Sequence, residues 1–307
     1  MPESPGTSAA APEVWRLARL SVLFVFDVAR ISRGEGDLLE PLLLTAILQA
    51  NQAALPGRPD LQLAYGGTQW ALPDAQRRPI SISALAHSLG LPFETVRRRA
   101  RALAARGLCV RTPEGLSVPE TVVTSPAYLA VLTARAARLA RLQAEAADAG
   151  LVAPAPGLGA FLAEAPRAGD RVLGDYMLRA CEAFMEPTGS AMDGVVLLAL
   201  CAGNLRDLDV RLVTGWEAYE GLLTPCRASA LAEALGAPGE TVRRHVLRLA
   251  EAGLAKRRRQ GWIAHAAPGN RPALVKIVER NAANLRRMLS TLADLAARES
   301  AAAARRA

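Results

Sequence analysis

Two copies of one short run hold the residue types best suited to binding chemistry in this chain. Glu94–Arg98 reads ETVRR, and Glu240–Arg244 repeats it letter for letter. A carboxylate accepts hydrogen bonds, and a guanidinium donates them in a planar fork that fits phosphate and other anionic groups. No paired carboxylates, nucleophile elbow or Gly-rich phosphate loop accompanies either run. The chemistry is therefore that of a polyanion-binding surface, and an enzyme is not expected.

The repeat extends well beyond these five residues. At an offset of 146 positions, Ser83–Leu108 and Ser229–Leu254 share 16 identities in 26 positions without a gap. Glycines and prolines match in register, as in Gly90 with Gly236. Chance similarity between Ala- and Leu-rich helices would not preserve these positions, so we interpret the chain as two versions of one module.

Positive charge is confined to the repeated segments. The chain of 307 residues has a formal net charge of +8. Residues 80–120 have six arginines against three glutamates, a net of +3, and residues 226–266 have eight basic residues against three glutamates, a net of +5. The rest of the chain is balanced, which indicates two docking surfaces for a polyanion rather than a uniformly basic protein.

The chain length allows about two domains. Ample Ala and Leu with few aromatic residues favour helices, so a mainly α fold is expected. We expect a disordered tail at 1–11, a first module at 12–149, a Pro/Gly-rich linker at 150–169, a second module at 170–298 and a tail at 299–307. The expected long helices are Pro12–Ile31, Leu38–Ala54, Pro126–Ala149, Asp170–Glu186, Asp193–Leu205 and Pro272–Arg298, with basic segments at about 80–118 and 226–266.

Cysteine and histidine spacing points to no metal site. Cys109, Cys181, Cys201 and Cys226 form no C-x2-C pair, and the three histidines share no ligand spacing. We expect the cysteines to be core residues of a reduced, cytoplasmic protein associated with the nucleoid, with no metal and no cofactor. No signal-peptide pattern is seen, and the apolar runs are shorter than the ~20 residues of a membrane span, so no membrane partner is expected.

Each basic segment predicts a short helix, a glycine turn, a longer basic helix and a small hairpin. Gly90 and Gly236 end the first helix, and Pro92 and Pro238 suit the start of the second. Val96, Ala100 and Leu103 recur at helical spacing and should face the core. The outer face is left to Glu94, Arg97, Arg98 and Arg101.

This pattern resembles the winged helix-turn-helix of bacterial transcription regulators of the catabolite-activator and GntR types. The resemblance covers about 40 residues in each copy. The flanking helices are loosely similar to those of the MarR type, in which terminal helices pair two subunits. The resemblance implies two tandem winged helix-turn-helix modules, and we hypothesise that their flanking helices pack about a pseudo-two-fold axis.

The resemblance also implies that the second helix enters the major groove of DNA. Glu94 and Glu240 then match an acid that accepts from cytosine N4, and Arg98 and Arg244 match an arginine that pairs with guanine. The phosphate contacts would come from Thr95, Thr241, Arg97 and Arg243. The preceding position is Phe93 in one copy and Gly239 in the other, so the two copies are not expected to read identical half-sites.

Further DNA contacts are expected around the two helices and the second hairpin. They are Arg101, Arg248, Lys256, Arg257, Arg258 and Arg259, whereas the first hairpin has only Arg111 and Glu114. His245 replaces Arg99 and is expected to face DNA. Trp70 and Trp216 precede the two segments and are interpreted as structural plugs, with an effector pocket as the alternative.

We therefore expect a sequence-specific, double-stranded DNA-binding transcription regulator with two reading heads in one chain. A replication-initiator-like, origin-binding role is the first alternative, and a winged-helix protein-interaction scaffold is the second. Homodimerisation and an unknown small-molecule effector are left open, as are the operator sequence and the direction of regulation.

Overall fold

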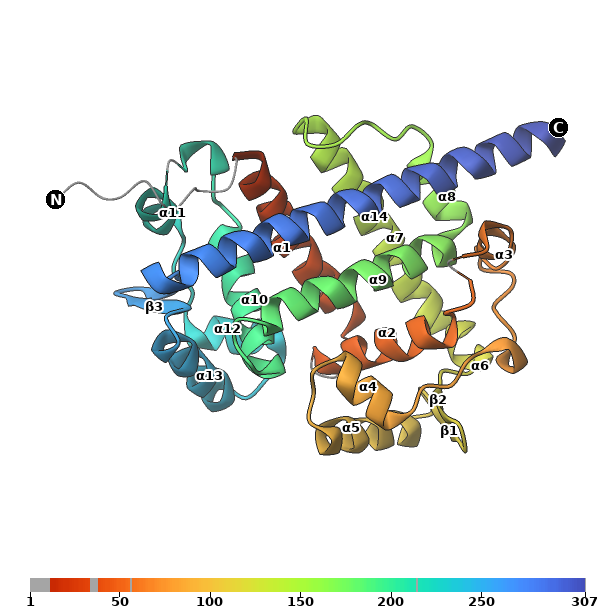
Figure 1. Cartoon of the computed structure of the whole chain (residues 1–307), viewed down its shortest axis with the longest axis horizontal. Coiled ribbons are helices and arrows are strands. Elements are labelled where there is room, and N and C mark those ends of the chain that lie inside the picture. Colours follow the sequence, from red (N-terminus) through yellow and green to blue (C-terminus); the bar gives the residue numbers. More distant parts are fainter. Residues whose placement is uncertain (1–11, 34–37, 56, 214, 307) are drawn as a thin grey trace. The chain divides into compact units, whose positions relative to one another are not determined.

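The computed structural model describes residues 12–33, 38–55, 57–213 and 215–306. The chain is mainly α-helical, as expected, with two small antiparallel hairpins (Figure 1). It forms two compact units: the described residues up to Arg30 with Ala180–Leu285, and Ile31–Arg179 with the described residues from Arg286 onward. The residues expected to form the N-terminal tail lie outside the described part.

The two units are interleaved along the chain, whereas the expected modules follow one another. The boundaries fall inside three long helices: α1 (Pro12–Ser32), α9 (Pro166–Met185) and α14 (Arg271–Arg306). The early part of α1 thus belongs to the unit that holds the second basic segment. Hydrogen bonds from Arg19 Nε to Leu205 O (3.0 Å) and from Asn281 Nδ2 to Ser21 Oγ (2.6 Å) join α1 to that unit.

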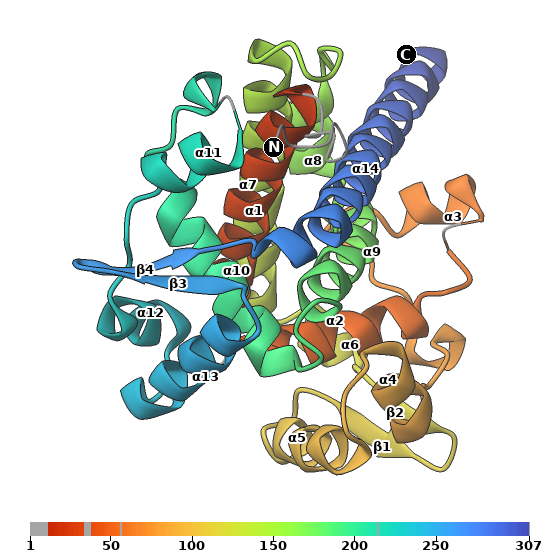
Figure 2. The ribbon, with the colours of Figure 1, turned by 60° about the vertical axis from the view of Figure 1, so that its left-hand side comes forward.

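The unit built on Ile31–Arg179 contains the first basic segment. Its elements are α2 (Leu39–Asn51), α3 (Pro59–Ala64), a 3-10 turn at Asp74–Gln76, α4 (Ile82–Ser88), α5 (Phe93–Ala105), β1 (Val110–Thr112), β2 (Gly115–Ser117), α6 (Glu120–Val123), α7 (Pro126–Asp148) and α8 (Leu158–Glu164). The unit built on Ala180–Leu285 contains α10 (Ala191–Leu205), a 3-10 turn at Val210–Leu212, α11 (Trp216–Leu222), α12 (Ala228–Leu235), α13 (Gly239–Glu251), β3 (Ala255–Arg258), β4 (Gly261–Ala264) and a 3-10 turn at Pro268–Asn270. Figure 2 shows β3 and β4 as a narrow projecting ribbon.

The expected long helices are present, with modest differences at their ends. Sequence analysis missed the short helices α3, α6, α8 and α11. The stretch 150–169, expected to be a linker, contains α8 and the start of α9. Helix α14 continues past Arg298 to Arg306 because the alanines there are strong helix formers. Among the described residues, no helix is long and apolar enough to cross a membrane.

The repeated sequence folds alike in the two units. Gly90 and Gly236 adopt φ values of +59° and +61°, which residues with a Cβ atom resist, and so end α4 and α12. The amide after each glycine donates to a carbonyl five residues back, over 3.0 Å in both copies. Val96, Ala100 and Leu103 are buried as expected, and Val242, Val246 and Leu249 are buried in α13.

Each hairpin gains a third strand-like partner from the segment before its helices. Ile80 pairs with Leu116, and Cys226 pairs with Trp262. A Cβ atom on Gly115 would lie 2.4 Å from Ile80 O, and one on Gly261 would lie 2.5 Å from Cys226 O. Glycine at these duplicated positions is therefore required by the close approach of two backbones.

A buried asparagine connects each hairpin to the helix that ends beside it. Asn51 closes α2, and its Nδ2 donates to Arg78 O (2.8 Å) and Leu116 O (3.2 Å), while its Oδ1 accepts from Val118 N (2.9 Å). The side chain gives the buried Val118 N–H its acceptor and adds a donor to each of the two carbonyls.

Asn204 makes the same set of bonds at the end of α10. Its Nδ2 donates to Thr224 O (2.7 Å) and Trp262 O (3.1 Å), and its Oδ1 accepts from Ala264 N (2.7 Å). The three partners are the residues 146 positions after those of Asn51. We call these two sets of bonds the asparagine clamps.

Asn204→Leu should lower the free energy of unfolding by about 2 kcal/mol, because the buried Ala264 N–H loses its acceptor and the carbonyls of Thr224 and Trp262 each lose a donor. Urea denaturation followed by circular dichroism measures the change. Asn284→Leu is the matched control: Asn284 is half-buried on α14, and the change should stay within about 0.5 kcal/mol. Equal losses in the two variants would contradict the role assigned to the clamp.

Candidate functional site

Helix α5 presents a charged face opposite its buried apolar stripe. Glu94, at its start, is exposed and accepts from Arg97 Nε over 2.9 Å. Arg98 and Arg101 are also exposed, and no ion pair holds either of them among the described residues. Thr95 is half-buried. The expected outer face therefore lies at the surface, with two arginines available to a partner.

Helix α13 repeats this arrangement. Arg243 Nη2 donates to Glu240 Oε1 over 2.8 Å, and this hydrogen bond lowers the pKa of the Glu240 carboxyl. Arg244 is exposed, outside any ion pair in the described part of the chain, and Thr241 is half-buried like Thr95. Each copy therefore has a carboxylate paired with the arginine three residues later and an unpaired arginine directly after that.

His245 lies on the inner side of α13 and Arg248 is exposed at its edge, and Asp193 contacts both. His245 is only 6% exposed, and its Nδ1 lies 2.6 Å from Asp193 Oδ1. Arg248 Nη2 donates to the same oxygen over 3.0 Å. The expectation that His245 faces DNA is wrong, because this residue lies one turn from Val242 and Leu249 on the buried stripe.

In the first copy an acid of α2 also contacts an arginine near the end of the repeat, although this arginine does not align with Arg248. Glu40, near the start of α2, accepts from Arg106 Nη1 over 2.5 Å. Asp193 lies near the start of α10, so in both units an acid on one helix meets a base late in the second helix of the repeat. These ion pairs fix the back of α5 and of α13 to the neighbouring helix.

The basic residues of the second hairpin fall into two groups. Lys256 Nζ and Arg258 Nη2 lie 3.7 and 3.8 Å from Glu220 Oε2 of α11, a residue that is 8% exposed. Arg257 lies over the ring of Trp262, with its Cζ atom 5.2 Å from the ring centroid. Arg259 is exposed near the turn. One half of the expected set is therefore paired with an acid, and the other half is open to solvent.

Three arginines line an open hollow beside the second hairpin. Arg257 and Arg259 come from the hairpin, and Arg227 comes from the residue before α12. Sequence analysis did not assign Arg227 to the site. The sequence feature that could have identified Arg227 is its alignment with Ser81. The Ser81 hydroxyl caps α4 by accepting from Ala84 N (3.1 Å). The second copy has replaced this cap with a positive charge.

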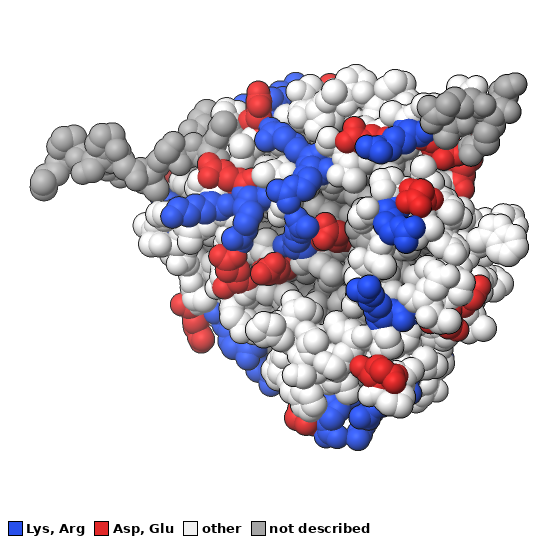
Figure 3. Space-filling view, turned by 45° about the vertical axis from the view of Figure 1, so that its right-hand side comes forward, with Lys and Arg blue, Asp and Glu red and all other residues white. Residues whose placement is uncertain are grey.

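The first hairpin is poorer in charge, with Arg111 and Glu114 both exposed. On the face shown in Figure 3, basic side chains form several separate groups with acidic side chains among them. Trp70 is 73% exposed, so its interpretation as a plug is wrong, whereas Trp216 lines a cavity. Among the described residues, no group of His, Cys, Asp and Glu is placed to hold a metal ion.

Comparison with protein-family models, with curated proteins and with solved structures finds no match.

Asp193→Ala should cost about 2 kcal/mol of stability, since it leaves the buried His245 without its partner, whereas the exposed Arg248 adds little. Glu40→Ala should cost less than about 1 kcal/mol, because its partner Arg106 is half-exposed and water screens the pair. Urea denaturation of both variants, and of Asp193→Ala combined with Arg248→Ala, tests the contact. Additive losses in the double variant would show that Asp193 and Arg248 do not act together.

Proposed function

We propose that this protein is a sequence-specific, double-stranded DNA-binding transcription regulator with two winged helix-turn-helix heads in one chain. The observation that carries the proposal is the duplicated second helix: α5 and α13 each bury an apolar stripe and expose Glu, Arg, Arg in the same arrangement. A purely structural helix gives no reason to keep this outer face in two copies.

In this proposal the exposed arginines read the bases. Arg98 and Arg244 lie in the first turns of α5 and α13, the part of a recognition helix that reaches base edges in the major groove. A guanidinium there pairs with guanine O6 and N7. Glu94 and Glu240, which are held by Arg97 and Arg243 in the free protein, accept from cytosine when their arginines turn to phosphates.

The second hairpin supplies phosphate contacts. The hollow suits a phosphate group, because Arg227, Arg257 and Arg259 line it and it is open to solvent. Arg248 contributes less than the sequence implied, since Asp193 already neutralises it. The first hairpin has only Arg111 and Glu114 in place of four basic residues, so the two heads are expected to contact DNA unequally.

The flanking helices would join the two heads about a pseudo-two-fold axis, as in the dimers of ordinary regulators. Two heads about 34 Å apart meet successive major grooves on one face of the duplex. Selected sites should then contain two half-sites whose centres are separated by about 10 base pairs. Mapping of bound genomic sites distinguishes promoters from a replication origin.

Replacing Arg98 and Arg244 together by alanine should abolish sequence preference and leave weaker, salt-sensitive binding, because the remaining basic residues contact only phosphates. Selection from a random pool of duplexes measures the preference. The matched control is Arg141→Ala with Arg179→Ala, which removes the same charge from exposed positions on α7 and α9.

Recovery of the wild-type sites by the Arg98/Arg244 double variant would refute the assignment of these two residues. A wild-type protein that binds no duplex at moderate salt would refute the DNA-binding function and favour the protein-interaction scaffold.

Arg227→Ser should reduce the slope of log affinity against log salt concentration by about 1, the value for one lost phosphate contact. The preferred sequence should not change, because the hollow touches no base. Serine already occupies the equivalent position 81 and caps α4 there, so the variant should remain folded. An unchanged salt slope, or a changed preferred sequence, would contradict the phosphate role.

A further inference from the structure

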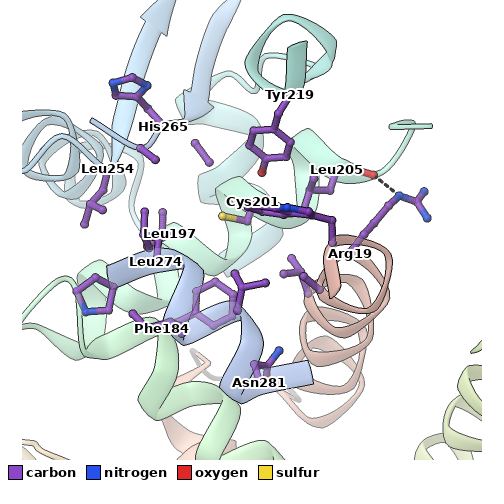
Figure 4. A pocket seen from close by; sticks show the side chains of 18 of the residues that line it. Arg19, Phe184, Leu197, Cys201, Leu205, Tyr219, Leu254, His265, Leu274 and Asn281 are labelled. Carbon is purple, nitrogen blue, oxygen red and sulfur yellow. Dashed lines mark hydrogen bonds between the residues drawn. The ribbon is translucent and has the colours of Figure 1, made fainter. Parts of the chain in front are cut away.

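The unit that contains the second hairpin encloses a cavity of about 140 Å³. Its walls come from α1, α9, α10, α11, α14 and the base of the hairpin, and Figure 4 shows the side chains that converge on it. Most are apolar: Ala18 and Val22 from α1, Leu197 and Leu205 from α10, and Val278 from α14 are examples. An apolar cavity of about 150 Å³ is large enough to admit a single-ring molecule.

Aromatic side chains form one wall of the cavity. Trp15 lies edge-on to Trp216, with ring centroids 5.2 Å apart, and Tyr219 lies 5.7 Å from Trp15. The Tyr219 hydroxyl points toward the side of the cavity on which Cys201 lies (Figure 4). Burial raises the pKa of Cys201 to about 12 and also raises the pKa of Tyr219. Both groups are therefore neutral at physiological pH, which favours an uncharged ligand.

One buried donor in this wall has no acceptor. Trp216 Nε1 is shielded from solvent and makes no hydrogen bond to the described residues. A buried N–H group of this kind is costly unless a partner reaches it. A ligand with one hydrogen-bond acceptor on an apolar ring would satisfy both the donor and the volume.

Two of the three aromatic residues belong to α11, the helix whose Glu220 contacts two basic residues of the second hairpin. Trp216 and Tyr219 face the cavity, and the next residue, Glu220, lies 3.7 Å from Lys256 Nζ and 3.8 Å from Arg258 Nη2. Glu220 Oε1 also lies 2.6 Å from His265 Nδ1, and His265 lines the cavity. The cavity is therefore present in the conformation in which the Glu220 carboxylate lies beside Lys256 and Arg258.

We propose that this cavity binds a small, neutral, single-ring ligand with one hydrogen-bond acceptor, and that the bound ligand weakens DNA binding by keeping Glu220 on Lys256 and Arg258. A ligand stabilises the conformation it binds best. In the bound state Glu220 partly neutralises these two exposed residues and weakens their attraction for phosphates. By reciprocity, DNA weakens ligand binding by the same factor. The coupling rests on the proposed DNA-binding function, whereas the ligand site does not.

Acetophenone and cumene are matched probes, because they have nearly the same shape and only acetophenone carries a carbonyl oxygen. Isothermal titration calorimetry without DNA should show binding of both and tighter binding of acetophenone. Trp216→Phe should remove that preference. Ala18→Phe and Val278→Phe fill the cavity from two different helices, and whichever of them folds should bind neither probe. Absence of heat with wild-type protein would overturn the ligand site, whatever DNA does.

Fluorescence anisotropy with a selected duplex tests the coupling. Saturating acetophenone should lower DNA affinity about tenfold, within the usual range of allosteric coupling. Glu220→Gln should bind acetophenone normally and lose this effect, whereas Glu217→Gln, an exposed change on the same helix, should retain it. Acetophenone binding without any change in DNA affinity would overturn the coupling. Failure of the protein to bind any duplex would overturn the function and the coupling together, while the calorimetry still decides the ligand site.

A second cavity, in the other unit, has the opposite chemistry. It is small, about 20 Å³, and Arg77, Arg167 and Arg171 line it. Each of the three is at most 7% exposed, and each has a buried nitrogen without a hydrogen-bond acceptor among the described residues: Arg77 Nη1, Arg167 Nη2 and Arg171 Nε.

The nearby acids do not balance these arginines. Asp170 lines the same cavity, but Arg135 Nη1 donates to it over 3.0 Å and the Tyr128 hydroxyl donates over 3.2 Å. Asp74 lies 3.1 Å from Arg77 Nε and is mostly exposed. Burial lowers the pKa of Arg171 to about 10, so this side chain remains charged at neutral pH.

We infer that this cavity is a site for one small inorganic anion of the size of chloride. An anion accepts from several N–H groups at once and offsets the excess buried charge, whereas one water molecule has only two acceptor positions. The volume admits about one water-sized sphere and excludes larger organic anions.

Thermal melting in sodium chloride and in sodium gluconate at matched ionic strength tests the anion site. Chloride should raise the melting temperature, and Arg77→Met should abolish the difference while Arg141→Met, an exposed control, retains it. Crystals of wild-type protein grown in bromide should show an anomalous peak between the three arginines, which decides the matter even if Arg77→Met does not fold. Equal melting in both salts, or no peak, would overturn the site.

Discussion

The asparagine clamps connect the segments that surround α4 and α5 in one unit and α12 and α13 in the other. Asn51 and Asn204 each join the end of one helix to two adjacent backbone segments, and one side-chain amide satisfies three backbone groups. A buried side-chain amide whose hydrogen bonds are all made holds its neighbouring segments in one relative orientation, because a shift of any segment would break some of these bonds. The hairpin, the segment before the first short helix and the long helix therefore move as one body.

The two copies share this frame and differ in what surrounds it. Ser81 caps a helix where Arg227 lines a hollow, and Leu48 lines the small cavity where Cys201 lines the large one. One cavity is apolar and the other is surrounded by guanidinium groups. Duplication within one chain allows such differences, because a mutation in one copy leaves the sequence of the other copy unchanged.

Much of the local structure could be predicted from the sequence. Glycine and proline spacing gave the ends of α4, α5, α12 and α13, since only particular backbone conformations suit those residues. The apolar spacing in α5 gave its buried face. The same spacing placed His245 one turn from Val242 and Leu249, and it could have shown that this residue is buried. Asn51 and Asn204 stood in register, but their bonds join backbone groups far apart in sequence, so no local pattern reveals them. The cavities were equally out of reach, because each is assembled from segments that only the tertiary fold brings together.

The interleaving of the two units has a consequence for synthesis of the protein. Leu17, Phe24 and Val25 of α1 are fully buried, yet the rest of their unit is encoded after residues 31–179. During synthesis, residues 31–179 of the other unit are made before the residues that cover α1 in its own unit. The helix is meanwhile exposed to aggregation or to wrong partners, the usual hazard of incomplete hydrophobic cores. The order of synthesis therefore leaves a segment that is made early to be buried late.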